Sequence, residues 1–168
     1  MKKLVLISGT MGIGKSTITK IISDQTENSV YLDGDWCWMM NPFIVNDENK
    51  AMVTSNIQFL LNSFIENSMI KTIFFCWVMD EQAIVDTLLN GIHQENIKIV
   101  HISLIASEKK LSEHIIKDID AGKRTHEDLK NSIERLHKYE QLNSTKLDIS
   151  NLTIPSIAYR LKQIVSLY

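Results

Sequence analysis

Residues 9–16 are the stretch of this sequence whose residue types and spacing most directly predict chemistry. They match the pattern G-x-x-x-x-G-K-[ST] in full. Glycines let such a loop turn tightly and direct backbone N–H groups at phosphate oxygens, and the positive end of the following helix favours the anion. The lysine of the pattern reaches the β- and γ-phosphates, and the serine hydroxyl ligates Mg²⁺. The expected nucleotide-binding residues are Gly9, Thr10, Met11, Gly12, Ile13, Gly14, Lys15, Ser16 and Thr17.

Asp33 and Asp35 form a second candidate site. They follow a short predicted strand, so both carboxylates are expected at the carboxyl edge of the sheet, where open α/β sheets bind ligands. Two residues apart on an extended segment, they would point the same way, toward the phosphate loop. One carboxylate can help to hold Mg²⁺ and its waters while the other accepts a proton from an attacking hydroxyl. The competing interpretation is a solvated turn, because Asp and Gly favour turns.

Alternating strand and helix patterns position these two sites. Short β-branched runs predict strands, and apolar residues at helical spacing predict helices. The expected strands are residues 3–8, 29–32, 72–79, 98–106 and 146–149; the expected helices are residues 15–25, 49–69, 81–91, 108–121, 127–142 and 155–165. This alternation predicts one α/β domain over residues 1–168 with a mainly parallel sheet. The helix pair in 108–142 has no strand between its members and is the expected moving part.

Several stretches of the chain resemble the small P-loop kinases related to gluconate kinase, shikimate kinase and the nucleoside-monophosphate kinases. They are GTMGIGKST from residue 9, YLDGD at 31–35, Lys123-Arg124, SIERLHKYE at 132–140 and KLDIS at 146–150. The resemblance covers nearly the whole chain. It implies a P-loop NTPase fold of three layers, α/β/α, with a five-stranded parallel sheet in the order 2-3-1-4-5. It also implies an acceptor-binding region at 36–70 and a helical lid at about 108–142.

The same resemblance implies roles for individual residues. Asp35 is the implied catalytic base, and Asp33 is the carboxylate on the Mg²⁺ side. Arg124 resembles the lid arginine that closes on the phosphates, and Arg135 is a second candidate for that contact. The loop at 150–153 is implied to lie near the nucleotide base. The implied cofactors are ATP and Mg²⁺.

Arg124 is also a candidate on chemical grounds. The chain has only three arginines, at positions 124, 135 and 160. Phosphoryl transfer depends mainly on positioning and charge neutralisation, and an arginine carried on a lid supplies both. The alternative is a solvated residue at a helix junction.

Asp80-Glu81 can be interpreted in two ways. The pair follows an apolar strand, as the acids of a Walker-B motif do. Acids are also favoured in the first turn of a helix, which is expected to begin here.

The expected acceptor-binding region carries little positive charge. Residues 36–70 contain no arginine and a single lysine, Lys50. Sites for anionic groups usually use arginine forks, so the sequence favours a neutral or cationic hydroxyl compound. Lid residues such as Lys123 or Arg124 can still hold an anion. The aromatic and methionine side chains at 36–40, together with Trp77, either wall an acceptor pocket or pack in the core.

Composition excludes several classes of protein. The chain has 168 residues, 44% hydrophobic and 23% charged, which is ordinary for one globular domain. A net charge of −2 gives no basic footprint for general nucleic-acid binding. No apolar run reaches the roughly 18 residues of a membrane span, and the five histidines and two cysteines show no metal-ligand spacing. These observations predict a cytoplasmic protein with no membrane partner; they do not predict its oligomeric state.

The sequence therefore predicts an enzyme that moves the γ-phosphoryl group of ATP to a hydroxyl of a small molecule. Lys15, Asp35 and Arg124 are the expected catalytic residues, and Ser16 and Asp33 the expected metal ligands. A nucleoside-monophosphate or sugar-acid kinase remains an alternative, as does a regulatory P-loop ATPase without a small-molecule acceptor. A GTPase is disfavoured, because the chain lacks the guanine-specifying N-K-x-D pattern.

Overall fold

A five-stranded parallel sheet forms the centre of the structure, a computed structural model that describes residues 1–167. Every strand pair in it is parallel, which requires a crossover between consecutive strands. The strand order is β2-β3-β1-β4-β5, so the predicted order is confirmed. The strands are β1 (Lys2–Ser8), β2 (Ser29–Asp33), β3 (Thr72–Trp77), β4 (Ile97–Ile105) and β5 (Thr145–Asp148).

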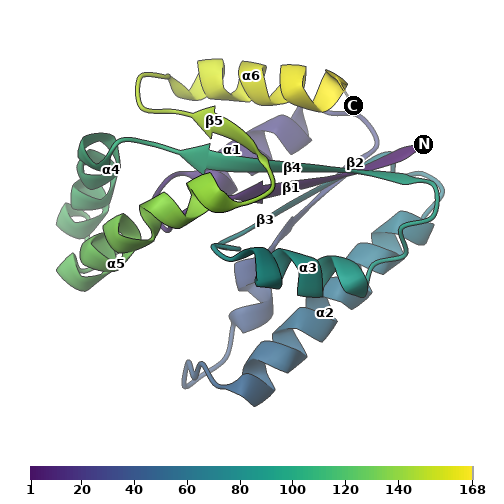
Figure 1. Cartoon of the computed structure of the whole chain (residues 1–168), viewed down its shortest axis with the longest axis horizontal. Helices are drawn as coiled ribbons and strands as arrows, with labels where there is room; N and C mark the ends of the chain where they lie inside the picture. The colour runs from purple at the N-terminus through teal and green to yellow at the C-terminus, as the bar shows by residue number, and fades with distance from the viewer. Residues whose placement is uncertain (168) are drawn as a thin grey trace.

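Helices cover both faces of this sheet and give the three predicted layers. α1 and α6 lie on one face and α2 and α3 on the other, while α4 and α5 stand at one end (Figure 1). The helices are α1 (Lys15–Asp24), α2 (Asp47–Glu66), α3 (Gln82–Asn90), α4 (Glu108–Asp120), α5 (His126–Leu136) and α6 (Ile154–Leu167), with short 3-10 helices η1 (Gly34–Trp38) and η2 (His137–Gln141). None of the helices in residues 1–167 combines the length and apolar character needed to cross a bilayer.

Two predicted elements differ from the structure. The third strand ends at Trp77 rather than continuing to residue 79, because Met79 has a positive φ of 40° that a strand does not allow. The helix expected at 127–142 ends at Leu136, and its last residues form η2. A continuous helical pattern does not separate α-helix from a tighter 3-10 turn at its end.

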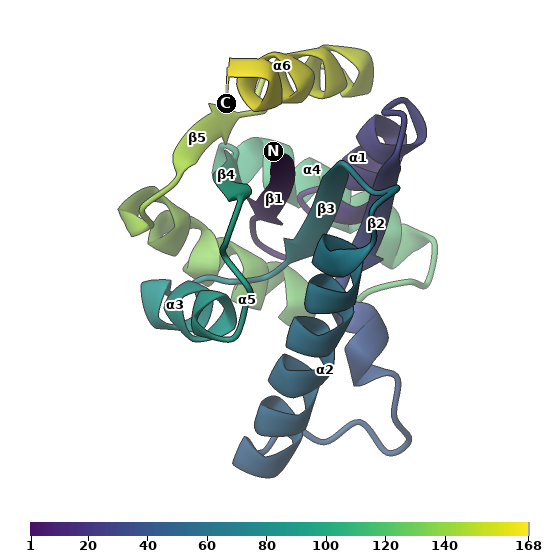
Figure 2. The ribbon, with the colours of Figure 1, turned by 90° about the vertical axis from the view of Figure 1, so that its right-hand side faces the viewer.

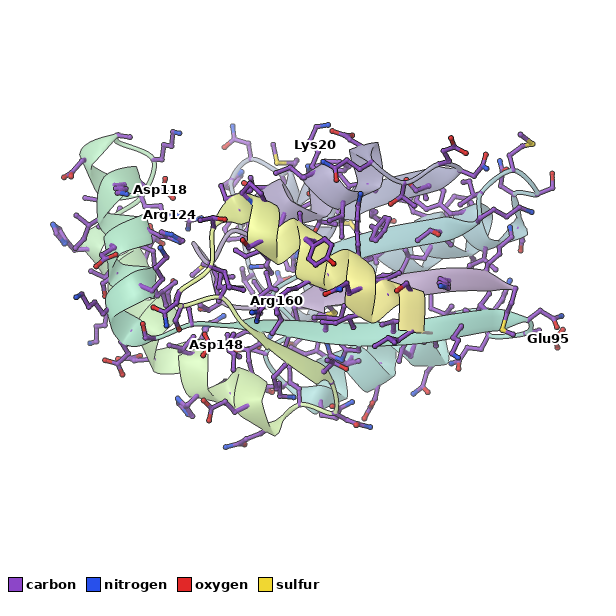
Figure 3. The ribbon with its side chains drawn as sticks, turned by 90° about the horizontal axis from the view of Figure 1, so that it is seen from above. Lys20, Glu95, Asp118, Arg124, Asp148 and Arg160 are labelled. Atoms are coloured by element: carbon purple, nitrogen blue, oxygen red, sulfur yellow. The ribbon has the colours of Figure 1, made fainter. Side chains whose placement is uncertain are left out.

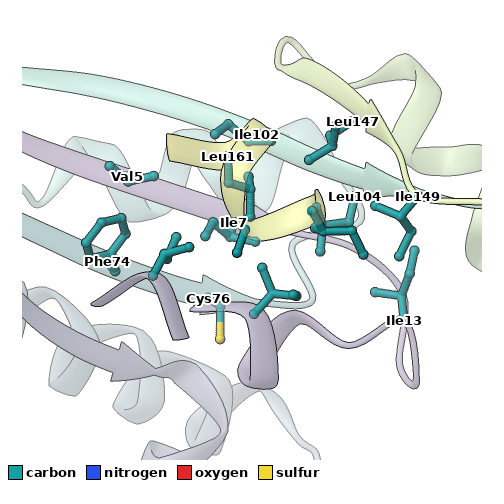
Figure 4. Close-up of a cluster of buried hydrophobic side chains, with 14 of the residues drawn as sticks. Val5, Ile7, Ile13, Phe74, Cys76, Ile102, Leu104, Leu147, Ile149 and Leu161 are labelled. Carbon is teal, nitrogen blue, oxygen red and sulfur yellow. The ribbon is translucent and has the colours of Figure 1, made fainter. Parts of the chain in front are cut away.

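The hydrophobic core has two halves because successive strand residues point to opposite faces. Val5 and Ile7 of β1 face α1, α4 and α6, where Leu161 of α6 joins the same cluster (Figure 4). Leu4 and Leu6 face α2 and α3. This explains why β1 and β3 read as continuous apolar runs, as strands buried on both faces do. The sheet is thereby held as a rigid platform for the loops at its carboxyl edge.

The α4–α5 pair is a two-helix unit at the end of the sheet (Figures 1 and 2). The two helices are joined at Gly122, which has a φ of 69°. α5 begins with a capping box, in which the Thr125 side chain accepts from the Asp128 N–H and the Asp128 carboxylate accepts from the Thr125 N–H. α4 therefore ends before, and α5 begins after, the junction Gly122-Lys123-Arg124-Thr125 that the sequence analysis placed between two helices.

His101 in β4 gives the fold a specific pH dependence. Burial, with a smaller contribution from Lys146, lowers the pKa of His101 from 6.5 to about 4. Between these pH values the unfolded chain binds a proton that the folded chain does not, so stability falls as the pH drops through this window. We expect the free energy of unfolding to lose about 3 kcal/mol between pH 7 and 4 through this group. Urea unfolding at several pH values measures it.

A His101→Gln variant should flatten this pH slope, whatever its stability at pH 7. The matched control is His93→Gln, because the His93 side chain is exposed and pairs with the exposed Glu66 carboxylate. An unchanged slope in His101→Gln would assign the acid sensitivity to other groups.

Candidate active site

The phosphate-loop pattern lies between β1 and α1, as its chemistry requires. Gly12 has a φ of 79°, and a Cβ placed there would lie 2.5 Å from Cγ1 of Ile115 in α4. The loop therefore needs glycine at this position both for its backbone conformation and for its close approach to α4. The Thr10 hydroxyl donates to the Ser132 carbonyl of α5 at 2.9 Å, so both α4 and α5 contact the loop.

Lys15 lies at the centre of the loop. The side chain is buried, and its Nζ donates to the Thr10 carbonyl oxygen at 3.0 Å. Burial lowers the pKa of Lys15, and the negative charges of Asp35 and Asp33 act in the opposite direction. The structure thus brings the loop lysine and the two predicted aspartates into one electrostatic group. Phosphate oxygens are the natural partners for such a buried cation.

Asp33 is the fixed member of the aspartate pair. It is buried at the end of β2, where its carboxylate accepts from the Tyr31 hydroxyl at 2.8 Å and from the Asp35 N–H at 3.0 Å. The Cys76 thiol lies 3.4 Å from Oδ2 of the same carboxylate. Burial raises the pKa of Cys76 to about 11, so the thiol keeps its proton and can donate. Three donors orient Asp33 before any ligand binds.

Asp35, the other member of the pair, lies in the short helix that follows β2. The sequence analysis expected an extended segment here, and this expectation was wrong, because Asp33 caps the 3-10 helix η1, which contains Asp35. Partial burial raises the pKa of Asp35, and the adjacent charge of Asp33 raises it further. Lys15 and a hydrogen bond from the Trp77 side chain act in the opposite direction. A carboxylate with a raised pKa is a better proton acceptor than an ordinary one.

Gly34 holds η1 against β3. A Cβ on Gly34 would lie 2.5 Å from Cγ of Trp77, so Gly34→Ala must push the indole away from Asp35. We expect a loss of about 2 kcal/mol in the free energy of unfolding, the usual cost of overpacking a core site, together with a change in tryptophan emission. Thermal and urea unfolding measure the first effect.

Gly91→Ala is the matched control for this substitution. A Cβ there would lie 2.3 Å from the Gln58 side-chain amide, the end of a side chain that can move aside at the cost of its hydrogen bonds to the Thr87 and Leu88 carbonyl oxygens. An equal loss of stability in the two variants would contradict a special role for the contact between Gly34 and Trp77.

The predicted metal ligands, Ser16 and Asp33, offer oxygen atoms on either side of Cys76. The thiol lies 4.0 Å from the Ser16 hydroxyl and 3.4 Å from the Asp33 carboxylate. Mg²⁺ prefers oxygen ligands and in nucleotide sites takes most of them from phosphates and water. No cluster of three or more His, Cys, Asp or Glu side chains within residues 1–167 can hold a metal alone. The donor set therefore fits a magnesium ion that arrives with a nucleotide.

Arg124 lies beside the phosphate loop. Its Nε donates to Oδ2 of Asp118 at 3.1 Å, and the two side chains lie together beside α4 (Figure 3). The same Nε is 3.9 Å from the position of a Cβ on Gly12. The positive charge of Arg124 contributes to lowering the pKa of both Lys15 and Asp35. Arg124 is thus within electrostatic range of Lys15 and Asp35 and is oriented by an acid of the preceding helix.

Arg135, the second candidate arginine, lies at a different place. Its Nε is 3.8 Å from Oδ2 of the buried Asp80, and Lys138 Nζ is 3.4 Å from the same atom. Lys138 also contacts Glu81 at 2.9 Å. Asp80 thus joins β3 to α5 and η2. The ion-pair partners of Asp80 are the Arg135 and Lys138 side chains. The predicted metal ligands, Asp33 and Ser16, instead both lie near the Cys76 thiol.

A cavity of about 410 Å³ opens beside this ion cluster, between η1, α2 and α3. Of the predicted aromatic residues, Trp38 and Trp77 line it, whereas Trp36 lies 55% exposed with its ring edge on Tyr31. Met39 is exposed. Trp38 and Trp77 therefore have the wall position that the sequence analysis left open.

A second cavity, of about 450 Å³, adjoins the phosphate loop on its other side. Gly12, Gly14 and Thr17 line it together with Leu152 and Thr153. Thr17 is exposed on α1 and faces this space. The loop at 150–153 is therefore next to the phosphate loop, at the place where the sequence analysis expected the nucleotide base.

Cys76 and Tyr31 belong to the site but were not identified from the sequence. Both contact Asp33, Cys76 from the neighbouring strand and Tyr31 from the same strand. In the parallel register Cys76 pairs directly with Asp33. The continuous apolar run of β3 gave no signal for Cys76. The alternation of β2 was the available signal for Tyr31, since residues two apart share a face.

Comparisons with known proteins agree with this fold. A family model described as an AAA domain matches residues 5–136. No curated protein matches the sequence. A gluconokinase from Sinorhizobium meliloti 1021 has a similar structure, with a TM-score of 0.71 and 15% identity over 98% of this chain and 93% of that one. A sugar kinase from Janibacter sp. HTCC2649 gives 0.70 and 13% over 99% and 95%. The Deinococcus radiodurans tunicamycin resistance protein gives 0.68 and 17% over 99% and 95%. The predicted resemblance to small P-loop kinases is thus confirmed as a shared fold.

Proposed function

The chain belongs to the AAA domain family, and from this premise we propose that it is a kinase that transfers the γ-phosphoryl group of ATP to a hydroxyl of a small molecule. The observation that carries the proposal is Asp35, a carboxylate of raised pKa that shares an electrostatic group with Lys15. A protein that only binds a nucleotide needs no proton acceptor at this place, whereas a kinase needs one for the acceptor hydroxyl. An ATPase would use the same carboxylate on water, so the acceptor panel below distinguishes the two. Two structural neighbours, a gluconokinase and a sugar kinase, support the same reaction class.

In this proposal the phosphate loop and Lys15 bind the β- and γ-phosphates, and the cavity beside residues 152 and 153 takes the base. Ser16 and Asp33 hold magnesium, which neutralises phosphate charge when bound. The oxygen of the acceptor hydroxyl attacks the γ-phosphorus of ATP, and Asp35 accepts the hydroxyl proton. Arg124 stabilises the charge that develops on the transferred group. The lid helices α4 and α5 exclude water that would otherwise hydrolyse ATP.

A nucleoside-monophosphate or sugar-acid kinase is a second candidate, favoured by one observation. Arg135 lines the cavity at η1, α2 and α3 and can bind an anionic acceptor if it leaves Asp80. The sequence argument for a neutral or cationic acceptor named Lys123 and Arg124 as lid residues that can hold an anion, but it did not name Arg135. The two candidates differ in the charge of the acceptor.

ADP release from Mg·ATP, measured against a panel of hydroxyl compounds, tests the proposal. The panel contains nucleosides, sugars, sugar acids, aminoglycosides, other hydroxylated antibiotics and nucleoside monophosphates. We expect stimulation by at least one member in wild type and none in Lys15→Ala. Stimulation by an anionic member alone would select the second candidate. ATP hydrolysis that no member changes would contradict the kinase and favour a regulatory ATPase.

A further inference from the structure

The cavity between η1, α2 and α3 is joined to Asp35 through one side chain. Trp77 lines the cavity, and its indole lies against Gly34, the residue next to Asp35, since a Cβ on Gly34 would be 2.5 Å from Trp77 Cγ. A compound bound against this indole is therefore adjacent to the proposed catalytic base. The volume of about 410 Å³ is in the range of pockets that bind drug-sized ligands, about 300–1,000 Å³.

The walls of this cavity are mainly apolar. Trp38 and Trp77 face it from η1 and β3, and Ile84 and Leu88 face it from α3. These side chains belong to the core cluster on the same face of the sheet, so the walls are held by packing. Thr54 and Thr87 are the uncharged polar side chains among the lining residues. An apolar body gains most from leaving water for such a surface.

The charges that line the cavity are already paired. The only carboxylate among the described lining residues is Asp80, which faces two cations, Arg135 and Lys138. Lys50, at the rim, contacts Asp47 at 3.4 Å. A cationic ligand would find no unpaired acid here, and an anionic one would have to separate Arg135 from a buried partner, which is costly. The charge arrangement therefore favours a neutral ligand.

The mouth of the cavity continues the apolar surface outward. Val45 lines the cavity although its side chain is 56% exposed. Phe43 is 66% exposed, and the centroid of its ring lies 5.7 Å from the centroid of the Trp38 ring. Exposed apolar side chains that adjoin a cavity commonly mark a binding surface. A ligand that fills the cavity can extend along residues 43–45.

We propose that the acceptor is a neutral amphiphile, whose hydroxyl-bearing end lies at Asp35 and Trp77 and whose apolar body fills the cavity and reaches Phe43. This inference rests on the proposed function for the claim that the hydroxyl is phosphorylated. The neutral and largely apolar character of the ligand is inferred from the cavity alone. It distinguishes this site from one that selects a sugar acid or a nucleoside monophosphate.

The experiment compares ligands that share a head or a tail. Octyl β-D-glucoside and methyl β-D-glucoside have the same neutral head, and octyltrimethylammonium and octyl sulfate carry the same tail with opposite charges. All are used below their micellar concentrations. Binding is followed by tryptophan emission, since two of the three tryptophans line the cavity. We expect octyl glucoside to bind at least tenfold more tightly than methyl glucoside and than either charged octyl compound.

Two variants locate the binding. Val45→Asp places a charge at the mouth on an exposed residue, so it should fold normally and weaken octyl glucoside binding about tenfold. Met69→Asp, at an exposed methionine that does not line the cavity, should bind as wild type does. Equal binding of the two glucosides, tighter binding of a charged octyl compound, or no effect of Val45→Asp would overturn the inference.

Failure of the inference and failure of the proposed function give different results. If the panel, with octyl β-D-glucoside added, finds only a charged or fully polar acceptor, the kinase stands and the amphiphile is excluded. If octyl glucoside binds as expected but no neutral amphiphile stimulates ADP release, the cavity has the inferred ligand class while phosphoryl transfer to it is excluded.

Discussion

Asp35→Asn is expected to lower kcat/KM about 10³-fold for any acceptor that the panel identifies, while ATP affinity stays near that of wild type. The asparagine keeps the size and the contact with Trp77 but cannot accept the hydroxyl proton. Asp33, buried and already bonded to three donors, has no free orientation from which to replace it. Asp24→Asn, at an exposed residue paired with Lys20 on α1, is the matched control.

The wild-type pH profile provides a second readout of the same residue. Asp35 must be ionised to act, so kcat/KM falls as the pH drops through its pKa. Because partial burial and Asp33 raise that pKa, the fall should begin at a higher pH than an ordinary aspartate, with a pKa of about 3.9, would give. A small effect of Asp35→Asn, or a rate that stays flat down to the ordinary range, would assign the proton to another group.

Lys15→Ala is expected to lower kcat about 10³-fold and also to weaken ATP binding. The variant removes the buried cation that faces both aspartates and leaves their repulsion unbalanced. Added nucleotide should then raise the melting temperature of wild type but hardly that of the variant, because a ligand stabilises only the state that binds it.

Lys20→Ala separates this effect from a loss of α1. Lys20 lies on the same helix but is exposed, and its partner is Asp24 at 2.7 Å. It should keep both turnover and nucleotide stabilisation. Turnover in Lys15→Ala close to that of Lys20→Ala would contradict the placement of the phosphates at the loop.

The sequence was sufficient to predict the fold because its local signals agree. The β1 run, the glycine pattern and the helix after it form one contiguous unit, and the parallel order follows from alternating strands and helices. Lys15, Asp33 and Asp35 could be placed together for the same reason, since the ends of parallel strands meet at one edge. Arg124 was a candidate from the family resemblance and from the scarcity of arginines, and not from a periodic pattern, because a junction of two helices has none.

Contacts between distant segments were not predictable in this way. The pairing of Asp80 with Arg135 and Lys138 joins residues more than fifty positions apart, and no local pattern encodes it. Cys76 reaches Asp33 only through the register of β2 on β3. Trp77 was a candidate wall residue, but its bond to Asp35 depends on the turn of η1 at Gly34.

The most direct test of the account follows the γ-phosphoryl group itself. Labelled γ-phosphate from ATP is traced in the presence of an acceptor from the panel, and the products are separated into inorganic phosphate and phosphorylated acceptor. We predict that the label appears on the acceptor hydroxyl, and that Asp35→Asn prevents this transfer while still binding ATP. Label found only in inorganic phosphate, with every class of acceptor present, would contradict phosphoryl transfer to a small molecule.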